Sequence, residues 1–241
     1  MQYIKGLDAF DGRNHTAVTL GKFDGLHRGH QKLLNRIMKY AKKEDCDSVV
    51  CAFDMDRDCL MTNEERRAFL EDKVDYLIEI PFTREMMEME AEKFIDEILY
   101  KKLHASHIVV GTDFNFGHEK RGNHQMLEKY AAKYGYTVDV VEKAYYKDRE
   151  ISSTYIRELL LDGNVPLANE LLGYPYEITS VVEHGQQLGR TLGFPTMNLA
   201  PQGKKILPKY GVYACRVLVD GVWYGGVGNA GVKPTVAQEK R

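Results

Sequence analysis

The regular alternation of short apolar segments with amphipathic segments, up to about residue 162, constrains the fold of this chain most. Apolar segments of strand length alternate with segments whose apolar residues recur at helical spacing. Strands flanked by such helices form a parallel sheet that is covered on both faces, so we expect an α/β fold. The predicted strands are Ala17–Leu20, Ser48–Phe53, Tyr76–Ile80, Ile108–Gly111 and Thr137–Val141, and the predicted helices lie near 28–43, 63–73, 91–103 and 123–134.

The segment 19–30, TLGKFDGLHRGH, follows the first predicted strand and precedes the first predicted helix. Gly21 and Gly25 allow the backbone to approach a ligand closely. The N–H groups and the dipole at the helix N-terminus favour an anion such as a phosphate. Neither a G-x-x-x-x-G-K-[ST] phosphate loop nor a G-x-G-x-x-G dinucleotide motif occurs here, so the segment represents a different class of phosphate site.

His27 and His30 are three residues apart, so one turn of helix directs both the same way. Three interpretations are open. The pair ligates a metal, for which Asp24 is the only obvious further ligand; it is a capping or partly buried pair; or it stabilises charge on a transferring phosphoryl or nucleotidyl group. The third interpretation is favoured because it needs no further ligand and fits the glycine loop.

A second segment with phosphate-binding potential, ISSTYIR, occupies residues 151–157 at the start of a predicted helix. The hydroxyls of Ser152, Ser153 and Thr154 can cap the free N–H groups of a helix or donate to phosphate oxygens. Arg157 lies one turn further and can clamp a triphosphate. A plain helix cap with a surface arginine explains the spacing equally well.

These motifs resemble those of a known family. GKFDGLHRGH is similar to the HxGH nucleotidyltransferases, in the form found in the FAD synthetase (FMN adenylyltransferase) module of bifunctional riboflavin kinase/FAD synthetases. ISSTYIR resembles the second signature of that module, and GTDFNFG at 111–117 resembles its G-x-D-F-x-F-G segment. The resemblance implies a Rossmann-like domain that transfers AMP from Mg-ATP to FMN, giving FAD and pyrophosphate.

The resemblance also implies roles for individual residues. His27, His30 and Arg157 would be catalytic. The nucleotide and its phosphates would contact Gly21, Phe23, Asp24, Gly25, Ser152, Ser153 and Thr154, and the flavin or nucleotide pocket would include Phe53, Asp113, Phe114 and Phe116. One departure is clear: the family usually has F-D-P-H-P after its second strand, and this chain has Phe53-Asp54-Met55-Asp56-Arg57. We therefore expect flavin affinity or selectivity to differ.

The character of the sequence changes after Gly163-Asn164: helical periodicity fades beyond Leu172, after one connecting helix, and β-rich segments appear at 176–182, 211–219 and 222–228. They predict antiparallel structure, as part of a β-barrel. The segment GRTLGFPTMNL at 189–199 resembles the riboflavin kinase module, in which the equivalents of Thr196 and Asn198 bind Mg²⁺ and ATP phosphate. A Gly/Pro turn between strands is the plainer alternative. We predict an adenylyltransferase domain at 1–164 and an incomplete riboflavin kinase-like domain at 165–241.

The sequence stops at Arg241, before the strands, helix and catalytic Glu that the resemblance implies for a complete kinase module. We therefore expect little or no conversion of riboflavin to FMN, and self-association through the open barrel. Two other functions compete with FAD synthesis: transfer to another phosphorylated acceptor, as in a cytidylyltransferase, and flavin or nucleotide binding without turnover.

Composition excludes several other classes. The net charge of −2 argues against a general nucleic-acid binder, and no apolar run approaches the length of a membrane span. The N-terminal MQYIKGLDAF has no signal-peptide core, and the four cysteines form no C-x-x-C pair. We therefore expect a cytoplasmic protein with reduced thiols.

Overall fold

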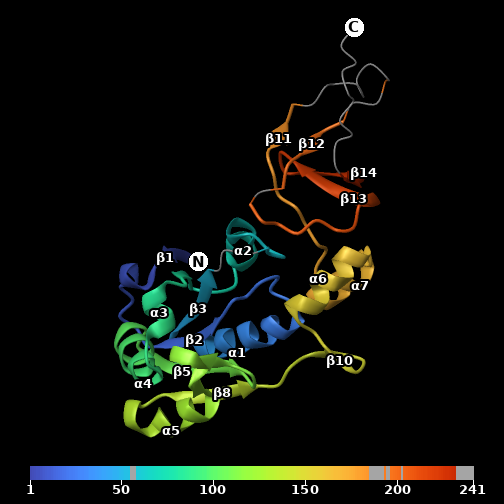
Figure 1. Cartoon of the computed structure of the whole chain (residues 1–241). Helices are drawn as coiled ribbons and strands as arrows, with labels where there is room; N and C mark the ends of the chain where they lie inside the picture. The colour runs from blue at the N-terminus through green and yellow to red at the C-terminus, as the bar shows by residue number, and fades with distance from the viewer. Residues whose placement is uncertain (55–57, 185–192, 194–195, 202, 232–241) are drawn as a thin grey trace.

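A computed structural model describes residues 1–54, 58–184, 193, 196–201 and 203–231 (Figure 1). Its larger part is built on a six-stranded sheet in the order β1-β4-β3-β2-β5-β8, in which every neighbouring pair is parallel. The strands are β1 Gln2–Lys5, β2 Thr16–Gly21, β3 Asp47–Asp54, β4 Tyr76–Pro81, β5 Ala105–Gly111 and β8 Thr137–Val141. The predicted α/β class is therefore confirmed.

The helices alternate with these strands as the periodicity predicts. The α-helices are α1 Arg28–Glu44, α2 Asn63–Leu70, α3 Arg84–Glu88, α4 Ala91–Lys93, α5 His124–Tyr134, α6 Ser153–Asp162 and α7 Val165–Leu172. A π-helical segment, Phe94–Lys102, continues α4, and short 3₁₀ turns occupy Leu7–Ala9 and His118–Lys120. Within the described ranges, no helix is both long enough and apolar enough to cross a membrane.

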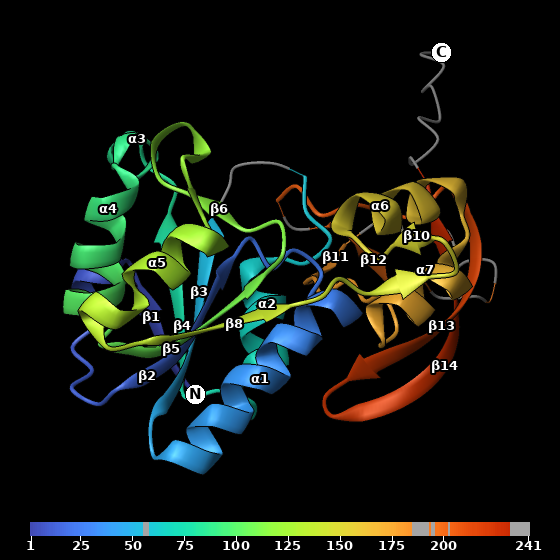
Figure 2. The ribbon, with the colours of Figure 1, turned by 90° about the horizontal axis from the view of Figure 1, so that it is seen from below.

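Helices cover the sheet on both faces (Figure 2), and alternate residues of β2 pack on opposite faces of it. In β2, Val18 and Leu20 belong to the core beneath α4, the π-helical segment and α5, whereas Ala17 belongs to the core beneath α1 and α2. This alternation follows from the two-residue period of a strand. Burial on both faces explains why the strands are nearly continuous apolar runs.

The chain order reverses at β2. From β2 the chain adds β3 and β4 on one side, and then β5 and β8 on the other. In open parallel sheets ligands bind beyond the carboxyl ends of the strands at such a switch point. The histidine segment leaves β2 at this place and the segment at 111–117 leaves β5 there.

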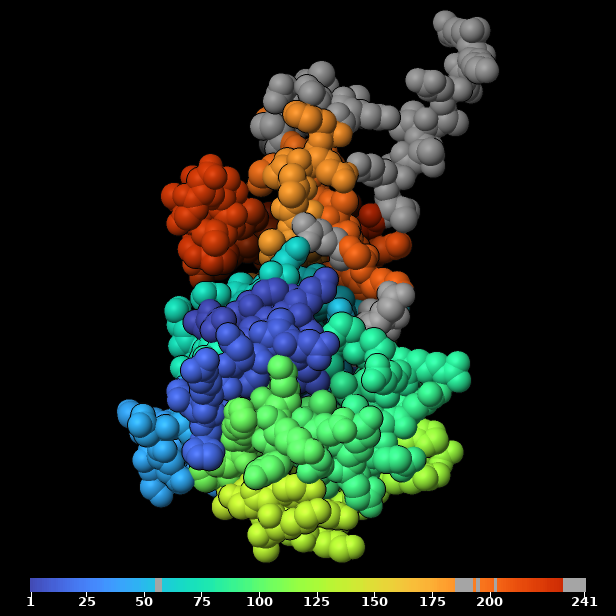
Figure 3. All heavy atoms as spheres, turned by 90° about the vertical axis from the view of Figure 1, so that its left-hand side faces the viewer, coloured from blue at the N-terminus to red at the C-terminus, as the bar shows by residue number. Residues whose placement is uncertain are grey.

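The remaining strands are short or antiparallel. Two two-residue pairs, β6 Asn115–Phe116 with β7 Gly122–Asn123 and β9 Tyr145–Tyr146 with β10 Arg149–Glu150, lie in loops of the α/β unit. After α7, β11 Val182–Glu183 pairs with β12 Asn198–Leu199, and β13 Gly211–Val219 pairs with β14 Val222–Ala230. Antiparallel structure is thus confirmed for this region, and the β13–β14 hairpin projects beyond the α/β unit (Figure 3).

One predicted strand is wrong. Residues 176–181 are not in a strand, and only Val182 of the predicted segment is. Here side chains satisfy the backbone in place of a neighbouring strand: Tyr176 N–H donates to Asn169 Oδ1 at 2.7 Å and Thr179 N–H to Glu65 Oε1 at 3.2 Å. Apolar content alone therefore misled the prediction.

The helices α6 and α7 hold the two regions together. Ile156, Leu160, Ala168 and Leu171 form one apolar cluster with Leu60. Asn164 caps α7 by accepting the N–H of Leu167, and Gly173 ends it. The predicted boundary at 164 thus falls within a packed pair of helices.

Candidate active site

The loop after β2 has an unusual backbone. Phe23, Gly25 and Leu26 have positive φ angles of 46°, 82° and 36°. Such angles cost a non-glycine residue free energy and persist only where neighbours enforce them. The side chains of Phe23 and Leu26 are fully buried, and a Cβ at Gly25 would lie 2.9 Å from Leu60 Cδ1. The core therefore fixes the loop in one conformation.

This loop presents His27 and His30 as a stacked pair. His27 is the N-cap of α1, and its Nδ1 accepts the N–H of His30 at 3.4 Å. The two ring centroids are 3.7 Å apart with planes inclined by 21°. Because Nδ1 of His27 accepts a hydrogen bond, its neutral ring carries the proton on Nε2.

Both imidazoles are neutral at physiological pH. Burial lowers the pKa of His27 to about 4. Burial, with smaller contributions from His27 and Arg66, holds the pKa of His30 well below its usual value. Nδ1 of His30 is buried and has no hydrogen-bond partner in the structure. A buried polar atom without a partner is costly, so an incoming polar ligand atom would be stabilised there.

Gly29, between the two histidines, leaves room for the His27 ring. A Cβ at this position would lie 3.1 Å from that ring, which is tighter than an ordinary contact, and 3.6 Å from the carbonyl oxygen of Ile151, which is an ordinary van der Waals distance. The His27 ring, rather than the chain before Ser152, is therefore the neighbour that favours a glycine here.

Asp24 is buried and supports both segments. Its Oδ1 accepts the N–H groups of Leu60 at 2.7 Å and Met61 at 3.2 Å, and its Oδ2 accepts from Arg157. The Ser153 hydroxyl donates to the Asp24 carbonyl at 2.8 Å. The Asp24 carboxylate thus accepts hydrogen bonds from both the segment at 60–61 and Arg157.

The other predicted phosphate contacts lie close by. Arg157 also donates to the Asp58 carbonyl, at 3.3 Å, and its side chain is one-fifth exposed. Ser152 is the N-cap of α6, where its Oγ accepts the N–H of Tyr155, and Thr154 is exposed in the first turn. Gly21 ends β2, and Phe23 is a core residue, so only the backbone of Phe23 is available to a ligand.

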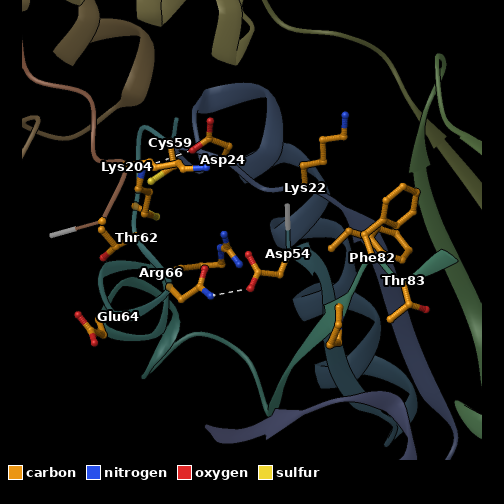
Figure 4. Close-up of a pocket in the computed structure, with 15 residues that line it drawn as sticks. Lys22, Asp24, Asp54, Cys59, Thr62, Glu64, Arg66, Phe82, Thr83 and Lys204 are labelled. Atoms are coloured by element: carbon orange, nitrogen blue, oxygen red, sulfur yellow. Dashed lines mark hydrogen bonds between the residues drawn. The ribbon is translucent and has the colours of Figure 1, made fainter. Parts of the chain in front are cut away.

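A cavity of about 720 Å³ lies beside this loop, beyond the carboxyl ends of β2, β3 and β4 (Figure 4). Phe53 lines it, with its ring edge-to-face with Phe82 at 5.7 Å. Lys22, Asp24 and Arg66 line it from the α/β unit, and Gly203 and Lys204 from the region after α7. The two histidines lie outside its lining.

The segment after β5 contributes less than expected. Asp113 is exposed and pairs with Lys143 at 3.0 Å. Phe114 is half-buried and stacks on Phe116 at 5.6 Å. Phe116 packs against Phe94 in the core. The Phe116 ring packs directly on Gly122, where an added Cβ would lie only 2.6 Å from it.

Several expectations concern segments with little described structure. Thr196 is exposed, and Asn198 lies in β12 opposite Glu183. Residues 55–57 of the altered F-D-M-D-R segment, and 189–192 and 194–195 of the kinase-like segment, lie outside the described residues. In the described part of the chain, no three His, Cys, Asp or Glu side chains converge to hold a metal ion.

Sequence reasoning missed the buried charges around the cavity. Arg66 is 5% exposed and lies 3.5 Å from Glu79, which also accepts from the Tyr3 hydroxyl. Its position four residues before the core residue Leu70 was an available signal, since that spacing puts both on one helix face. Glu65 and Lys205 form a second buried pair, which is discussed below.

Comparison with known proteins identifies the family. A family model described as FAD synthetase matches residues 10–155, and one described as riboflavin kinase matches residues 172–241. Proteins named bifunctional riboflavin kinase/FMN adenylyltransferase are similar: that of Escherichia coli K12 is 36% identical over 91% of this chain and 74% of its own length.

Two further relatives agree. The Haemophilus influenzae protein of the same name is 36% identical over 98% of this chain and 80% of its own length. A crystal structure of a protein named macrolide-efflux protein, from Streptococcus pneumoniae, superposes with a TM-score of 0.85 at 30% identity, over 95% of this chain and 78% of that one. The chain therefore belongs to the bifunctional riboflavin kinase/FMN adenylyltransferase family, whose two modules it matches in order.

Proposed function

We propose that this protein transfers AMP from Mg-ATP to FMN, forming FAD and releasing pyrophosphate. A phosphate oxygen of FMN attacks the α-phosphorus of ATP, a new P–O bond forms, and the bond to pyrophosphate breaks. The observation that carries this proposal is the hydrogen bond from the Ser153 hydroxyl to the Asp24 carbonyl at 2.8 Å, which joins the histidine loop to the hydroxyl-rich start of α6. That contact assembles an anion site from segments more than 100 residues apart.

The histidines act as neutral hydrogen-bond donors in this proposal. The N–H at Nε2 of His27 and a ring N–H of His30 stabilise the negative charge that develops on the α-phosphate and the leaving pyrophosphate. Nδ1 of His30 gains a partner when the triphosphate arrives. Such catalysis consists of positioning and electrostatics and needs no covalent intermediate.

The start of α6 holds the phosphates. Ser152 and Thr154 contribute hydroxyl donors and Ser153 a backbone N–H, since the Ser153 hydroxyl donates to the Asp24 carbonyl, and Arg157 contributes a cation that Asp24 keeps in place. Gly21 and Gly25 let the nucleotide approach the loop. Mg²⁺ enters as part of Mg-ATP, because Mg²⁺ needs few protein ligands when phosphates supply oxygens.

The flavin occupies the cavity beside the loop. Phe53, with Phe82 beside it, offers an apolar surface for the ring system. Arg66 and Lys22 supply positive charge to the same cavity. Asp113 and Phe114, at the end of β5, complete the pocket from the other side of the switch point.

The region after α7 is proposed as a separate riboflavin kinase-like module, so that the chain divides into 1–164 and 165–241. Thr196 and Asn198 would bind Mg-ATP there, and riboflavin is the substrate of the family's kinase module, whose turnover in this chain we expect to be low or absent. Its exposed apolar residues on β13 and β14 are the proposed site of self-association. The protein acts on small molecules in the cytoplasm, without nucleic acid or membrane. The mass of the protein in solution tests the self-association.

Chromatography of the products tests the function. The purified chain is incubated with Mg-ATP and either FMN or riboflavin, and CTP replaces ATP in a parallel reaction. FAD from FMN and ATP is the expected result. FAD from riboflavin would show that both modules act in one chain. Reaction with CTP would favour another nucleotidyltransferase, and FMN binding without pyrophosphate release would favour a binding protein.

A further inference from the structure

The segment Cys59–Thr62 lies between the histidine loop and the riboflavin kinase-like region (Figure 4). On one side, the N–H groups of Leu60 and Met61 donate to Asp24. On the other side, the segment pairs with residues 204–206: Cys59 N–H donates to the Lys204 carbonyl and Ile206 N–H donates to the Cys59 carbonyl, both at 2.9 Å. The histidine loop therefore binds the N–H groups of Leu60 and Met61, and the riboflavin kinase-like region binds the backbone of Cys59.

The side chain of Lys205 adds buried contacts to this pairing between Cys59 and residues 204–206. Its side chain is 2% exposed, and its ammonium donates to the Leu60 carbonyl at 2.7 Å and to Glu65 Oε2 at 2.5 Å. The ammonium also lies 4.5 Å from the centroid of the Tyr176 ring, which attracts a cation. The Leu60 carbonyl, the Glu65 carboxylate and the Tyr176 ring thus surround the buried ammonium of Lys205.

Glu65 extends the connection into α2. Its Oε2 accepts the N–H of Thr62 at 2.9 Å, which forms part of a capping box at the start of that helix. Its Oε1 accepts the N–H of Thr179 from the region after α7. The Lys205–Glu65 pair therefore joins α2, the segment Cys59–Thr62 and the kinase-like region at one buried point.

The contacts continue to the proposed phosphate site. The peptide groups of Leu60 are held on both sides, with the N–H on Asp24 and the carbonyl on Lys205. Asp24 in turn holds Arg157 and lies three residues before His27 in the same loop. The position of Lys205 is thereby transmitted through Leu60 and Asp24 to Arg157.

We propose that Lys205 is a positioning residue for adenylyl transfer, through which the riboflavin kinase-like region completes the site in the α/β unit. This inference rests on the proposed function. A buried ion pair is a poor source of stability, since apolar residues of the same volume often stabilise as well. Its directional contacts with the Leu60 carbonyl and Glu65 instead fix the geometry of the segment.

The main variant is Lys205→Met, which keeps the length of the side chain and removes its donors. We expect kcat/KM for Mg-ATP to fall by between about 10-fold and about 100-fold, as small misplacements of binding groups do. The KM for Mg-ATP rises, because Asp24 and with it Arg157 are held less firmly once Leu60 loses the Lys205 donor; simple loss of folded protein would leave KM unchanged. Lys209→Met, the same change at an exposed position four residues on, is the control and keeps wild-type kinetics.

A double variant distinguishes the positioning role of Lys205 from its effect on the stability of the protein. Lys205→Met alone leaves the Glu65 carboxylate buried and unpaired, which destabilises the protein. Adding Glu65→Gln removes that charge but loses one of the two N–H bonds from Thr62 and Thr179 that the carboxylate accepts, so the melting temperature recovers in part toward that of the wild type. We expect the double variant to stay slow, since the Leu60 carbonyl still lacks its donor. Wild-type kcat/KM in a double variant of recovered stability would overturn the proposal.

Amide hydrogen exchange provides a test without turnover. In Lys205→Met, exchange at Leu60 and Met61 should accelerate relative to the β-sheet of the same protein. Unchanged exchange at these two amides would overturn the positioning role, whether or not FAD is made. A wild-type chain that makes no FAD would instead overturn the proposed function, and accelerated exchange would still support the coupling of the two regions.

Discussion

The α/β unit and the β13–β14 hairpin are both built from apolar strands, yet they are stabilised differently. Leu77 in β4 is fully buried beneath helices, whereas Leu218 in β13 is 53% exposed and no residue of β13 or β14 is buried. The hairpin depends on local geometry: Asp220 and Gly221 at its turn have φ angles of 47° and 79°, as a two-residue type I′ turn requires. Similar sequence patterns therefore lead to a core in one region and an exposed ribbon in the other.

The largest expected change in stability comes from a substitution in the core of the α/β unit. Leu77→Ala should lower the free energy of unfolding by about 2–5 kcal/mol, because it removes buried methyl groups and leaves a cavity. Leu218→Ala, the same change on the hairpin, should alter it by less than about 0.5 kcal/mol. Urea unfolding of both variants measures the difference. Equal losses would show that the hairpin has a core of its own in solution.

The next effect concerns the chemistry assigned to the α/β unit. His30→Ala should lower the turnover of FAD synthesis by about 100-fold to 1,000-fold, as loss of a transition-state donor does, with little change in KM for Mg-ATP. His118→Ala, at a partly exposed histidine paired with Glu90 and outside the site, is the control. Initial rates of FAD formation measure both. Weaker ATP binding at unchanged turnover would contradict the role assigned to His30.

The buried histidines should also make the α/β unit sensitive to acid. The pKa of His27 is about 4 in the folded protein, below its ordinary value of 6.5. Between these values the unfolded chain binds a proton that the folded one excludes, so stability falls as pH decreases from 6.5 toward 4. For His27 this amounts to about 2–3 kcal/mol between pH 7 and pH 4.5.

Urea unfolding at both pH values measures this loss. The control is His27→Asn, which keeps a helix-capping side chain and cannot titrate. The variant should lose correspondingly less stability on acidification. An equal loss in both proteins would mean that His27 is not buried in its neutral form.

The smallest expected effect is confined to the hairpin. Gly221→Ala should destabilise the ribbon by about 1 kcal/mol, since its φ is left-handed while no atom lies near the added Cβ. Gly225→Ala, also in open space but without a positive φ, is the control. Amide exchange in β13 and β14 should accelerate only in the first variant, without change in the sheet. Equal exchange in the two variants would count against the turn.

The sequence predicted the elements that depend on local patterns of apolar and turn residues. The strands β2 to β8 of the sheet, the start of α1 at the histidines and the β13–β14 hairpin all follow from periodicity and turn residues. It did not predict β1, since Gln2–Lys5 is short, has only Ile4 buried, and is a strand because it pairs with the edge of β4. It also missed the Lys205–Glu65 pair, because a contact between residues 140 apart leaves no local signal.

The candidate site was predictable to the same extent. The motifs identified His27, His30 and the start of α6, and the structure adds that Asp24 joins these two segments. They did not reveal that Asp24 contacts Leu60 and Met61, or that Phe116 belongs to the core. A motif specifies which residues occur together, whereas long-range contacts decide which of them face the ligand.

The most direct test of adenylyl transfer follows the α-phosphate of ATP. The wild-type chain is incubated with FMN and Mg-ATP that carries a radioactive α-phosphate, and the products are separated. The proposed reaction predicts that the label enters FAD and that one unlabelled pyrophosphate is released for each FAD formed. Label that remains in ATP, or that appears only in AMP or ADP while FMN is unchanged, would contradict it.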